Sequence, residues 1–148
     1  MTLETGASAP EVTALNQDGE EVSPAFDETA VVYFYPRDGT PGCTLEAREF
    51  EADIESFRRA GVTVYGVSTD DVDSHREFAD EEELTFDLLA DPDGAVADAF
   101  GVETRDDFVD RVTFVLADGE VKAVLDADDM RPEGHAADVL EAVRRVEG

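Results

Sequence analysis

A strand that runs directly into a helix constrains the fold of this chain more than any other feature. Residues 30–35 are uncharged and mostly β-branched or aromatic, and a proline follows them, which is the pattern of a buried strand. After the connecting loop, Thr40 suits the N-cap of a helix, and Pro41 suits the first helical position, where its missing donor costs nothing. We therefore predict a strand over residues 30–35 and a helix over 40–60 that Gly61 closes.

Patterns typical of strands and helices alternate along the rest of the chain. The predicted helices are 74–83, 95–100 and 136–146. The predicted strands are 62–67, 84–90, 111–117 and 120–125, with a further hairpin over 12–22 and no element assigned to 101–110. This order indicates a single α/β domain over residues 1–148, with a mixed central sheet flanked by helices. It fits a thioredoxin-like fold with an N-terminal hairpin extension.

Cys43 is the single cysteine of the chain, and it falls in the first turn of the predicted helix over 40–60. Free backbone N–H groups and the positive end of the helix dipole favour an anion at this place, so the pattern indicates a nucleophilic thiolate. A helix terminus usually contributes only ~0.3 to 1 kcal/mol, and a cation or further donors must therefore assist it. The alternative is that Cys43 is a buried, unreactive side chain, as lone cysteines often are.

The chain carries 38 acidic residues against 11 basic ones, which gives a formal net charge of -27. This charge would repel nucleic acid and anionic lipid, so we expect neither as a partner. The acids are dispersed among a normal complement of core residues, 42% hydrophobic, and this distribution differs from that of an acidic tail or a disordered chain. We interpret the charge as an adaptation to concentrated salt, where screening relieves the repulsion.

Neither a metal site nor a targeting segment is indicated. His75 and His135 have no cysteine partner at metal-ligand spacing, and the acids at 70, 71 and 73 lack the glycine and glutamate of a calcium loop. We therefore expect no metal and no cofactor. The first residues show neither the basic region nor the apolar core of a signal peptide, and no apolar run reaches membrane-spanning length, so we expect a cytoplasmic protein without a membrane partner.

Pro36, Thr40 and Cys43 reproduce the spacing proline, three residues, threonine or serine, two residues, cysteine. With residues 41–47 around it, this stretch resembles the atypical peroxiredoxins of the bacterioferritin-comigratory-protein type, also called peroxiredoxin Q. Weaker matches occur at 66–70, 111–114 and 134–136. The resemblance implies a thiol-dependent peroxidase that reduces hydrogen peroxide and organic hydroperoxides through a cysteine sulfenic acid.

The same resemblance implies roles for five residues. Cys43 would be the nucleophile, Thr40 would hydrogen-bond the thiolate and the peroxide, and Arg111 would supply the cation. Glu46 would orient Arg111, and Pro36 would shape the loop and shield the sulfenic acid. Simpler interpretations stay open: capping for Thr40, a strand-end ion pair with the neighbouring aspartate for Arg111, and an ordinary first-turn acid for Glu46.

Arg48 occupies the position at which many members of this family carry a second cysteine. Since Cys43 has no partner in its own chain, a one-cysteine mechanism would need an external thiol or a thioredoxin-like reductant. We expect a monomer or a weak homodimer. A second function remains open, that of a thioredoxin-fold oxidant sensor or client-binding protein without efficient turnover.

Overall fold

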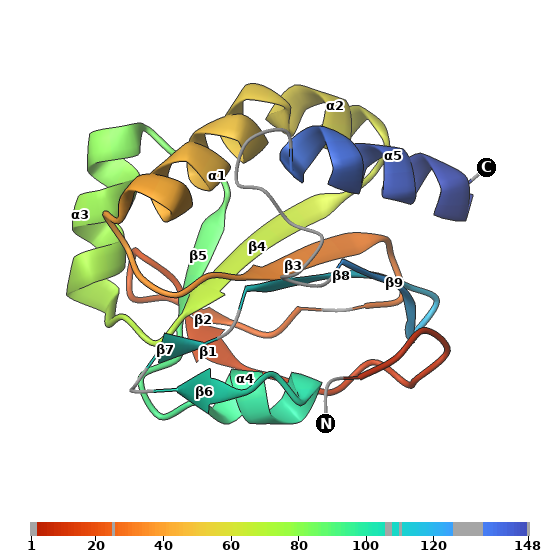
Figure 1. Cartoon of the computed structure of the whole chain (residues 1–148), viewed down its shortest axis with the longest axis horizontal. Helices are drawn as coiled ribbons and strands as arrows, with labels where there is room; N and C mark the ends of the chain where they lie inside the picture. The colour runs from red at the N-terminus through yellow and green to blue at the C-terminus, as the bar shows by residue number, and fades with distance from the viewer. Residues whose placement is uncertain (1–2, 25, 106–107, 110, 126–134, 148) are drawn as a thin grey trace.

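A seven-stranded mixed sheet forms the centre of the protein (Figure 1), in the order β2-β1-β5-β4-β3-β8-β9. The computed structural model describes residues 3–24, 26–105, 108–109, 111–125 and 135–147. The strands of the sheet are β1 (Ala14–Leu15), β2 (Glu21–Val22), β3 (Ala30–Phe34), β4 (Thr63–Ser68), β5 (Asp87–Ala90), β8 (Val112–Ala117) and β9 (Glu120–Leu125). Strands β3, β4 and β5 are parallel, and the others join them antiparallel.

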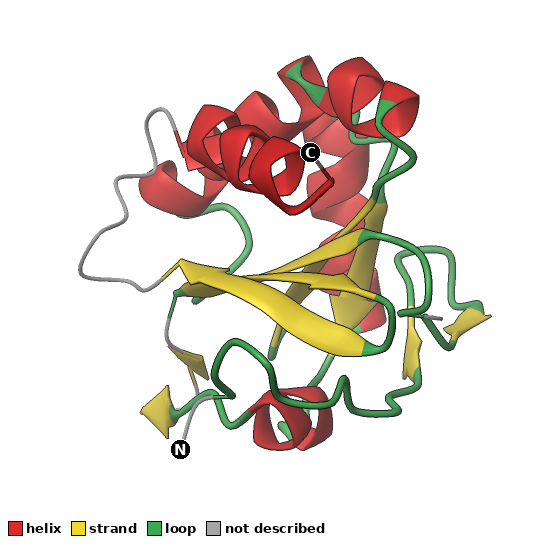
Figure 2. Cartoon of the chain, turned by 90° about the vertical axis from the view of Figure 1, so that its right-hand side faces the viewer, coloured by secondary structure: helices red, strands yellow, loops and turns green. Residues whose placement is uncertain are grey.

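Helices cover both faces of the sheet, as Figure 2 shows. On one face lie α1 (Pro41–Ala52), α2 (Ile54–Arg59), α3 (Val72–Glu82) and α5 (His135–Glu147), and on the other lies α4 (Ala95–Phe100). Because β-strand side chains alternate between faces, Val31 and Tyr33 of β3 enter the core under α1, whereas Val32 and Phe34 enter the core above α4. The predicted fold class is therefore confirmed, and the N-terminal hairpin extends the sheet through the pair Leu15–Ala90.

Two predicted elements differ from the structure in their bounds, and one segment without a predicted element contains a pair of strands. The helix predicted over 40–60 is interrupted at Asp53, whose φ of -98° and ψ of 6° leave the helical region. The strand predicted over 84–90 begins only at Asp87, the first residue of β5 that pairs with β4, and the Gln17 side chain bonds the backbone of Phe86 and Leu88. The segment 101–110, without an assigned element, contains a two-stranded pair, β6 (Thr104–Arg105) with β7 (Phe108–Val109).

The register of the sheet brings distant parts of the chain together at one end of β3. Phe34, the last residue of β3, pairs with Val112, the first residue of β8. Arg111 precedes Val112, and the loop from β3 to α1 begins directly after Phe34. Backbone pairing thus places Arg111 beside the loop that leads to α1. Within the described residues, no helix is long and apolar enough to cross a membrane.

Candidate active site

Cys43 is the third residue of α1, and only 1% of its surface is exposed. Pro41 opens the helix as predicted, and Thr40 stands at the N-cap position with an extended backbone, φ -75° and ψ 151°. The sulfur therefore lies in the first turn, where the helix dipole favours an anion. Because the sulfur is buried, only small reactants can reach it unless the loop moves.

Arg111 joins Cys43 to Glu46. Its Nη2 donates to the Cys43 sulfur at 3.3 Å, and its Nη1 donates to Oε1 of Glu46 at 2.5 Å. The Arg111 side chain is 17% exposed and that of Glu46 is fully buried, so solvent screens this pair little. The structure thus brings three of the predicted site residues together. Asp110, the alternative partner of Arg111, lies outside the described residues.

Glu46 lies one turn after Cys43 on the same face of α1. Burial raises the pKa of Glu46 from 4.5 to about 7, although the attraction of Arg111 opposes this rise. Desolvation therefore outweighs the ion pair, and the carboxyl group changes its charge near neutral pH. The ionised form holds the guanidinium in place by a charge-assisted hydrogen bond.

Thr40 and Pro36 lie in the loop that leads from β3 to Cys43. The Thr40 hydroxyl donates to the carbonyl oxygen of Arg37 at 3.0 Å, and the described structure gives it no capping bond to α1. Thr40 is therefore the N-cap residue by position, as predicted, but its side chain makes no capping bond and donates to the Arg37 carbonyl instead. With its proton engaged, the Thr40 oxygen is left as an acceptor toward a third group. Pro36 is half-buried directly after Tyr35.

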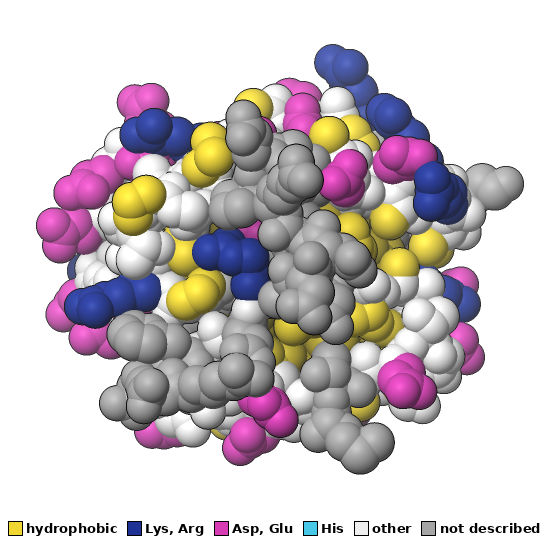
Figure 3. Space-filling model, viewed as in Figure 1, with side chains coloured by type: hydrophobic (Ala, Val, Ile, Leu, Met, Phe, Trp, Pro, Cys, Tyr) yellow, Lys and Arg dark blue, Asp and Glu magenta, His cyan; other side chains and the backbone are white. Residues whose placement is uncertain are grey.

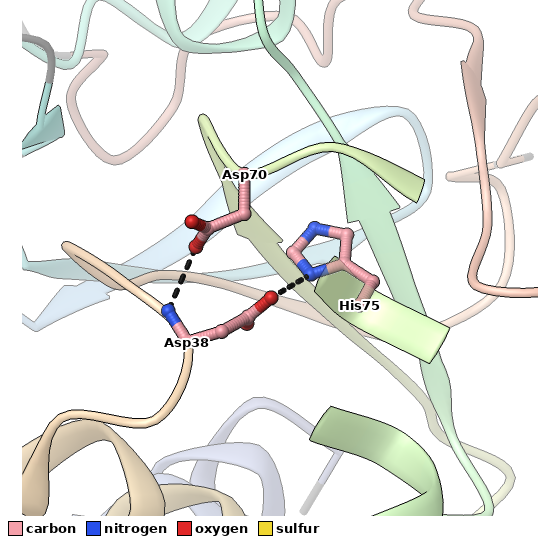
Figure 4. A group of neighbouring side chains, drawn as sticks. All are labelled: Asp38, Asp70 and His75. Carbon is pink, nitrogen blue, oxygen red and sulfur yellow. Dashed lines mark hydrogen bonds and ion pairs between the residues drawn. The ribbon is translucent and has the colours of Figure 1, made fainter. Parts of the chain in front are cut away.

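A buried polar network next to this loop was missed by sequence reasoning (Figure 4). His75 of α3 is fully buried, and its Nδ1 lies 2.7 Å from Oδ2 of Asp38. The Asp38 carboxylate also accepts from Tyr35 Oη at 2.6 Å and from Ser74 Oγ at 2.8 Å, while the Asp38 backbone N–H donates to Asp70 at 2.7 Å. The available signal was His75 on the same helical face as the apolar residues three and four positions later.

Asp38, Asp70 and His75 lie close enough to hold a metal ion, with ligand atoms within 4.8 Å of one another. Hydrogen bonds within the protein already engage Nδ1 of His75 through Asp38 and Nε2 through the carbonyl oxygen of Leu89 at 3.0 Å. An ion would have to displace these bonds, so the group is better explained as a structural network. His135 begins α5, and its side chain lies outside the described residues.

The remaining basic residues near the site lie at the surface. Arg48 is exposed and forms an ion pair with Glu82 of α3, and Arg37 is exposed in the loop. Figure 3 shows Asp and Glu side chains dispersed over the visible face. This distribution agrees with the dispersed acids of the sequence.

Comparison with known proteins gives consistent matches over nearly the whole chain. The model of the AhpC/TSA family matches residues 5–124. The chain is 36% identical over 148 residues to peroxiredoxin Bcp of Escherichia coli strain K12, a match that covers 93% of this chain and 94% of the relative. It is 37% identical over 145 residues to the chloroplastic peroxiredoxin Q of Oryza sativa subsp. japonica, covering 95% and 67%.

Solved structures agree with these relatives. Peroxidoxin BcpB of Mycobacterium tuberculosis superposes with a TM-score of 0.90 at 30% identity, over 97% of this chain and 98% of the other. A structure of Xanthomonas campestris bacterioferritin comigratory protein, described in connection with alkyl peroxide reduction, superposes with a TM-score of 0.88 at 28% identity, over 98% and 100%. The resemblance drawn from the residues around Cys43 is therefore confirmed.

Proposed function

Since the chain belongs to the AhpC/TSA family and is a thiol-dependent peroxidase, we propose that Cys43 is its reacting residue. The observation that carries this proposal is the contact of Arg111 Nη2 with the Cys43 sulfur at the start of α1. A guanidinium at this distance favours the thiolate over the thiol. Cys43 is also the single cysteine of the sequence.

The proposed reaction begins with attack of the Cys43 thiolate on one peroxide oxygen. A sulfur–oxygen bond forms as the oxygen–oxygen bond breaks, and the departing hydroxide or alkoxide takes up a proton to leave as water or an alcohol. Cys43 is thereby oxidised to a sulfenic acid. Negative charge moves onto the departing oxygen, so donors already aimed there lower the barrier.

The other site residues take roles that fit their positions. Arg111 stabilises the thiolate and the charge that develops on the peroxide, and Glu46 orients Arg111 through the bond at 2.5 Å. Thr40 accepts a hydrogen bond from the peroxide O–H, since its own proton is donated to Arg37. Pro36 shapes the loop and shields the sulfenic acid from water.

An external thiol completes the cycle in this proposal. A first thiol condenses with the sulfenic acid, which releases water and leaves a mixed disulfide at Cys43. A second thiol, or the second cysteine of a thioredoxin-like protein, attacks that disulfide and returns the Cys43 thiol. The single cysteine of the sequence supports this one-cysteine route. Arg48 occupies the position at which many members of the family carry a second cysteine.

The proposed substrates are hydrogen peroxide and organic hydroperoxides, the second supported by the alkyl peroxide reduction named for the Xanthomonas campestris protein. A peroxidase that depends on reduced thiols fits a reducing compartment, and we assign it to the cytoplasm. The net charge of -27 supports a salt-rich environment, and within it we propose a monomer or a weak homodimer.

Steady-state consumption of peroxide tests the proposal. The wild-type protein in molar potassium chloride should consume peroxide in the presence of dithiothreitol, and Cys43→Ser should consume none while keeping its circular dichroism spectrum. An alcohol cannot present an anionic nucleophile at neutral pH, so turnover by the folded Cys43→Ser variant would refute the assignment.

A further inference from the structure

His75 connects the end of β5 to the loop that carries Cys43. Its Nε2 lies 3.0 Å from the carbonyl oxygen of Leu89, and its Nδ1 lies 2.7 Å from Oδ2 of Asp38. The imidazole is fully buried, and so is most of the Asp38 side chain, which is 5% exposed. A buried polar pair of this kind loses much if either partner is removed, because the remaining group is left without its bond.

Hydrogen-bond chemistry fixes the direction of the bond between His75 and Leu89. A carbonyl oxygen only accepts, so Nε2 of His75 carries a proton. Asp38 already accepts from Tyr35 and Ser74, and burial raises the pKa of Tyr35 well above its ordinary value, which keeps that phenol a donor. Tyr35 and Ser74 thus both donate to the Asp38 side chain, and Nδ1 of His75 shares a hydrogen bond of 2.7 Å with Oδ2 of the same group.

The bonds to Asp38 fix the loop between β3 and α1. Tyr35 Oη bonds a residue three positions further along the chain, and the Asp38 backbone N–H bonds Asp70 at the end of β4. The next residues are Gly39 and Thr40, and Thr40 in turn bonds the carbonyl of Arg37. Five residues after Asp38 the chain reaches Cys43. The position of the Cys43 turn therefore depends on where Asp38 is held.

We propose that His75 is a positioning residue for the peroxidase reaction: through Asp38 it holds the 36–40 loop so that Thr40 and Cys43 meet the peroxide in productive geometry. This inference rests on the function proposed above. His75 does not touch the substrate, and its effect passes through Nδ1 and the Asp38 carboxylate. A misplacement of about 1 Å in a reacting group can lower a rate by up to ~10²-fold, so a support of this kind affects catalysis as well as stability.

Two amide variants separate the two bonds of His75. His75→Asn places an amide N–H near the position of Nδ1 and keeps a donor to Asp38, whereas His75→Gln places one near Nε2 and keeps the donor to Leu89. Both are neutral and similar in chemistry, which makes each the control for the other. We expect the second-order rate of Cys43 oxidation by peroxide, measured in a single turnover, to fall less than about threefold in His75→Asn and at least about tenfold in His75→Gln.

Two variants of Asp38 test the same inference if the His75 variants do not fold. Asp38→Asn can accept from Tyr35 and donate to a neutral imidazole, so it retains the link without charge, whereas Asp38→Leu keeps the branched shape and removes the link. We expect the first to stay within about threefold of the wild-type rate and the second to fall by at least about tenfold. All rates are measured at temperatures where circular dichroism shows the variant folded.

Val121→Ala controls for stability alone, because Val121 is buried in β9 in the core on the α4 face. It should lower the thermal midpoint without lowering the rate. Equal rates for His75→Asn and His75→Gln, or for the two Asp38 variants, would overturn the inference. If wild-type Cys43 is oxidised while these rates stay equal, the proposed function stands and only the role of His75 fails; if wild-type Cys43 is not oxidised, the proposed function itself fails.

Discussion

The guanidinium of Arg111, the residue before β8, donates a hydrogen bond of 3.3 Å to the sulfur of Cys43 in the first turn of α1. The two residues are 68 positions apart, and the antiparallel pairing of β3 with β8 brings them together. The pairing places a cation where a first-turn thiolate most needs one, since the helix dipole alone contributes only ~0.3 to 1 kcal/mol.

Arg111→Met keeps an unbranched side chain and removes the charge and the donors. We expect the fraction of Cys43 present as thiolate at neutral pH to fall, and the rate of oxidation by peroxide at high pH to fall by ~10² or more, because in the proposed mechanism Arg111 acts on both sulfur and peroxide. Alkylation by iodoacetamide across pH measures the first quantity and stopped-flow kinetics the second. Arg48→Met, the same change at an exposed position, should alter neither. Unchanged alkylation and oxidation in Arg111→Met would assign the cation to another residue.

Glu46→Gln should change how stability depends on pH. Burial raises the pKa of Glu46 to about 7, so the folded protein holds this proton more tightly than the unfolded chain does. The contribution of the group to stability is complete below about pH 4.5, and it declines as the pH rises through about 7, by about 3 kcal/mol in all. The glutamine keeps the hydrogen bond to Arg111 and has no proton to lose.

Urea unfolding of the wild type and of Glu46→Gln in molar potassium chloride measures how the stability of each depends on pH. The unfolding free energy of the wild type minus that of Glu46→Gln should decline between about pH 4.5 and pH 8.5. The subtraction cancels the titration of the other acids. A constant difference over this range would mean that Glu46 keeps its charge throughout.

Thr40→Val keeps the shape of the side chain and removes the hydroxyl. We expect the oxidation rate of Cys43 to fall by ~10² if Thr40 accepts the peroxide proton in the transition state. Thr40→Ser should restore most of the rate, and Thr44→Val, the same change within α1, serves as the matched control. A loss smaller than about threefold in Thr40→Val would limit Thr40 to its bond with Arg37.

Some of these site residues could be identified from the sequence more directly than others. Pro36, Thr40 and Cys43 lie within one short segment, so their spacing in the sequence is enough to indicate the nucleophile. Cys43 and Glu46 lie on one helix, so the prediction of α1 is enough to place them on the same face. The contact of Arg111 depends on strand register, and the resemblance to a known family supplied it. The roles themselves stay predictions until the variants are measured.

The Asp38–His75 pair was not predictable in the same way. It depends on how α3 packs against the loop after β3, a long-range placement that no local pattern contains. The late start of β5 depends on its pairing with β4, which begins at Asp87, and β6 and β7 have two residues each, too few to show a strand pattern in the sequence. A buried histidine on an apolar helical face was the one local signal.

Salt should raise stability. A net charge of -27 makes self-repulsion comparable with the ~5 to 15 kcal/mol by which domains are usually stable. Potassium chloride at ~1 M reduces the screening length to ~3 Å from ~10 Å at 0.1 M, which weakens repulsion between surface acids and spares the buried contacts of Arg111. The thermal midpoint, measured by circular dichroism, should therefore rise when potassium chloride is raised from ~0.1 M to ~1 M. A midpoint that is flat or falling would contradict the adaptation to salt and leave the peroxidase chemistry untouched.

The most direct test of the central claim is the mass of Cys43 after one equivalent of hydrogen peroxide in molar potassium chloride. Intact-protein and peptide mass spectrometry, with dimedone present to trap a sulfenic acid, should find a single modification on the peptide that contains Cys43, and none in Cys43→Ser. Without the trap, the protein should gain one oxygen atom, and a small thiol should convert it to a mixed disulfide. Consumption of the peroxide with Cys43 left unmodified, in protein shown to be folded, would contradict the account.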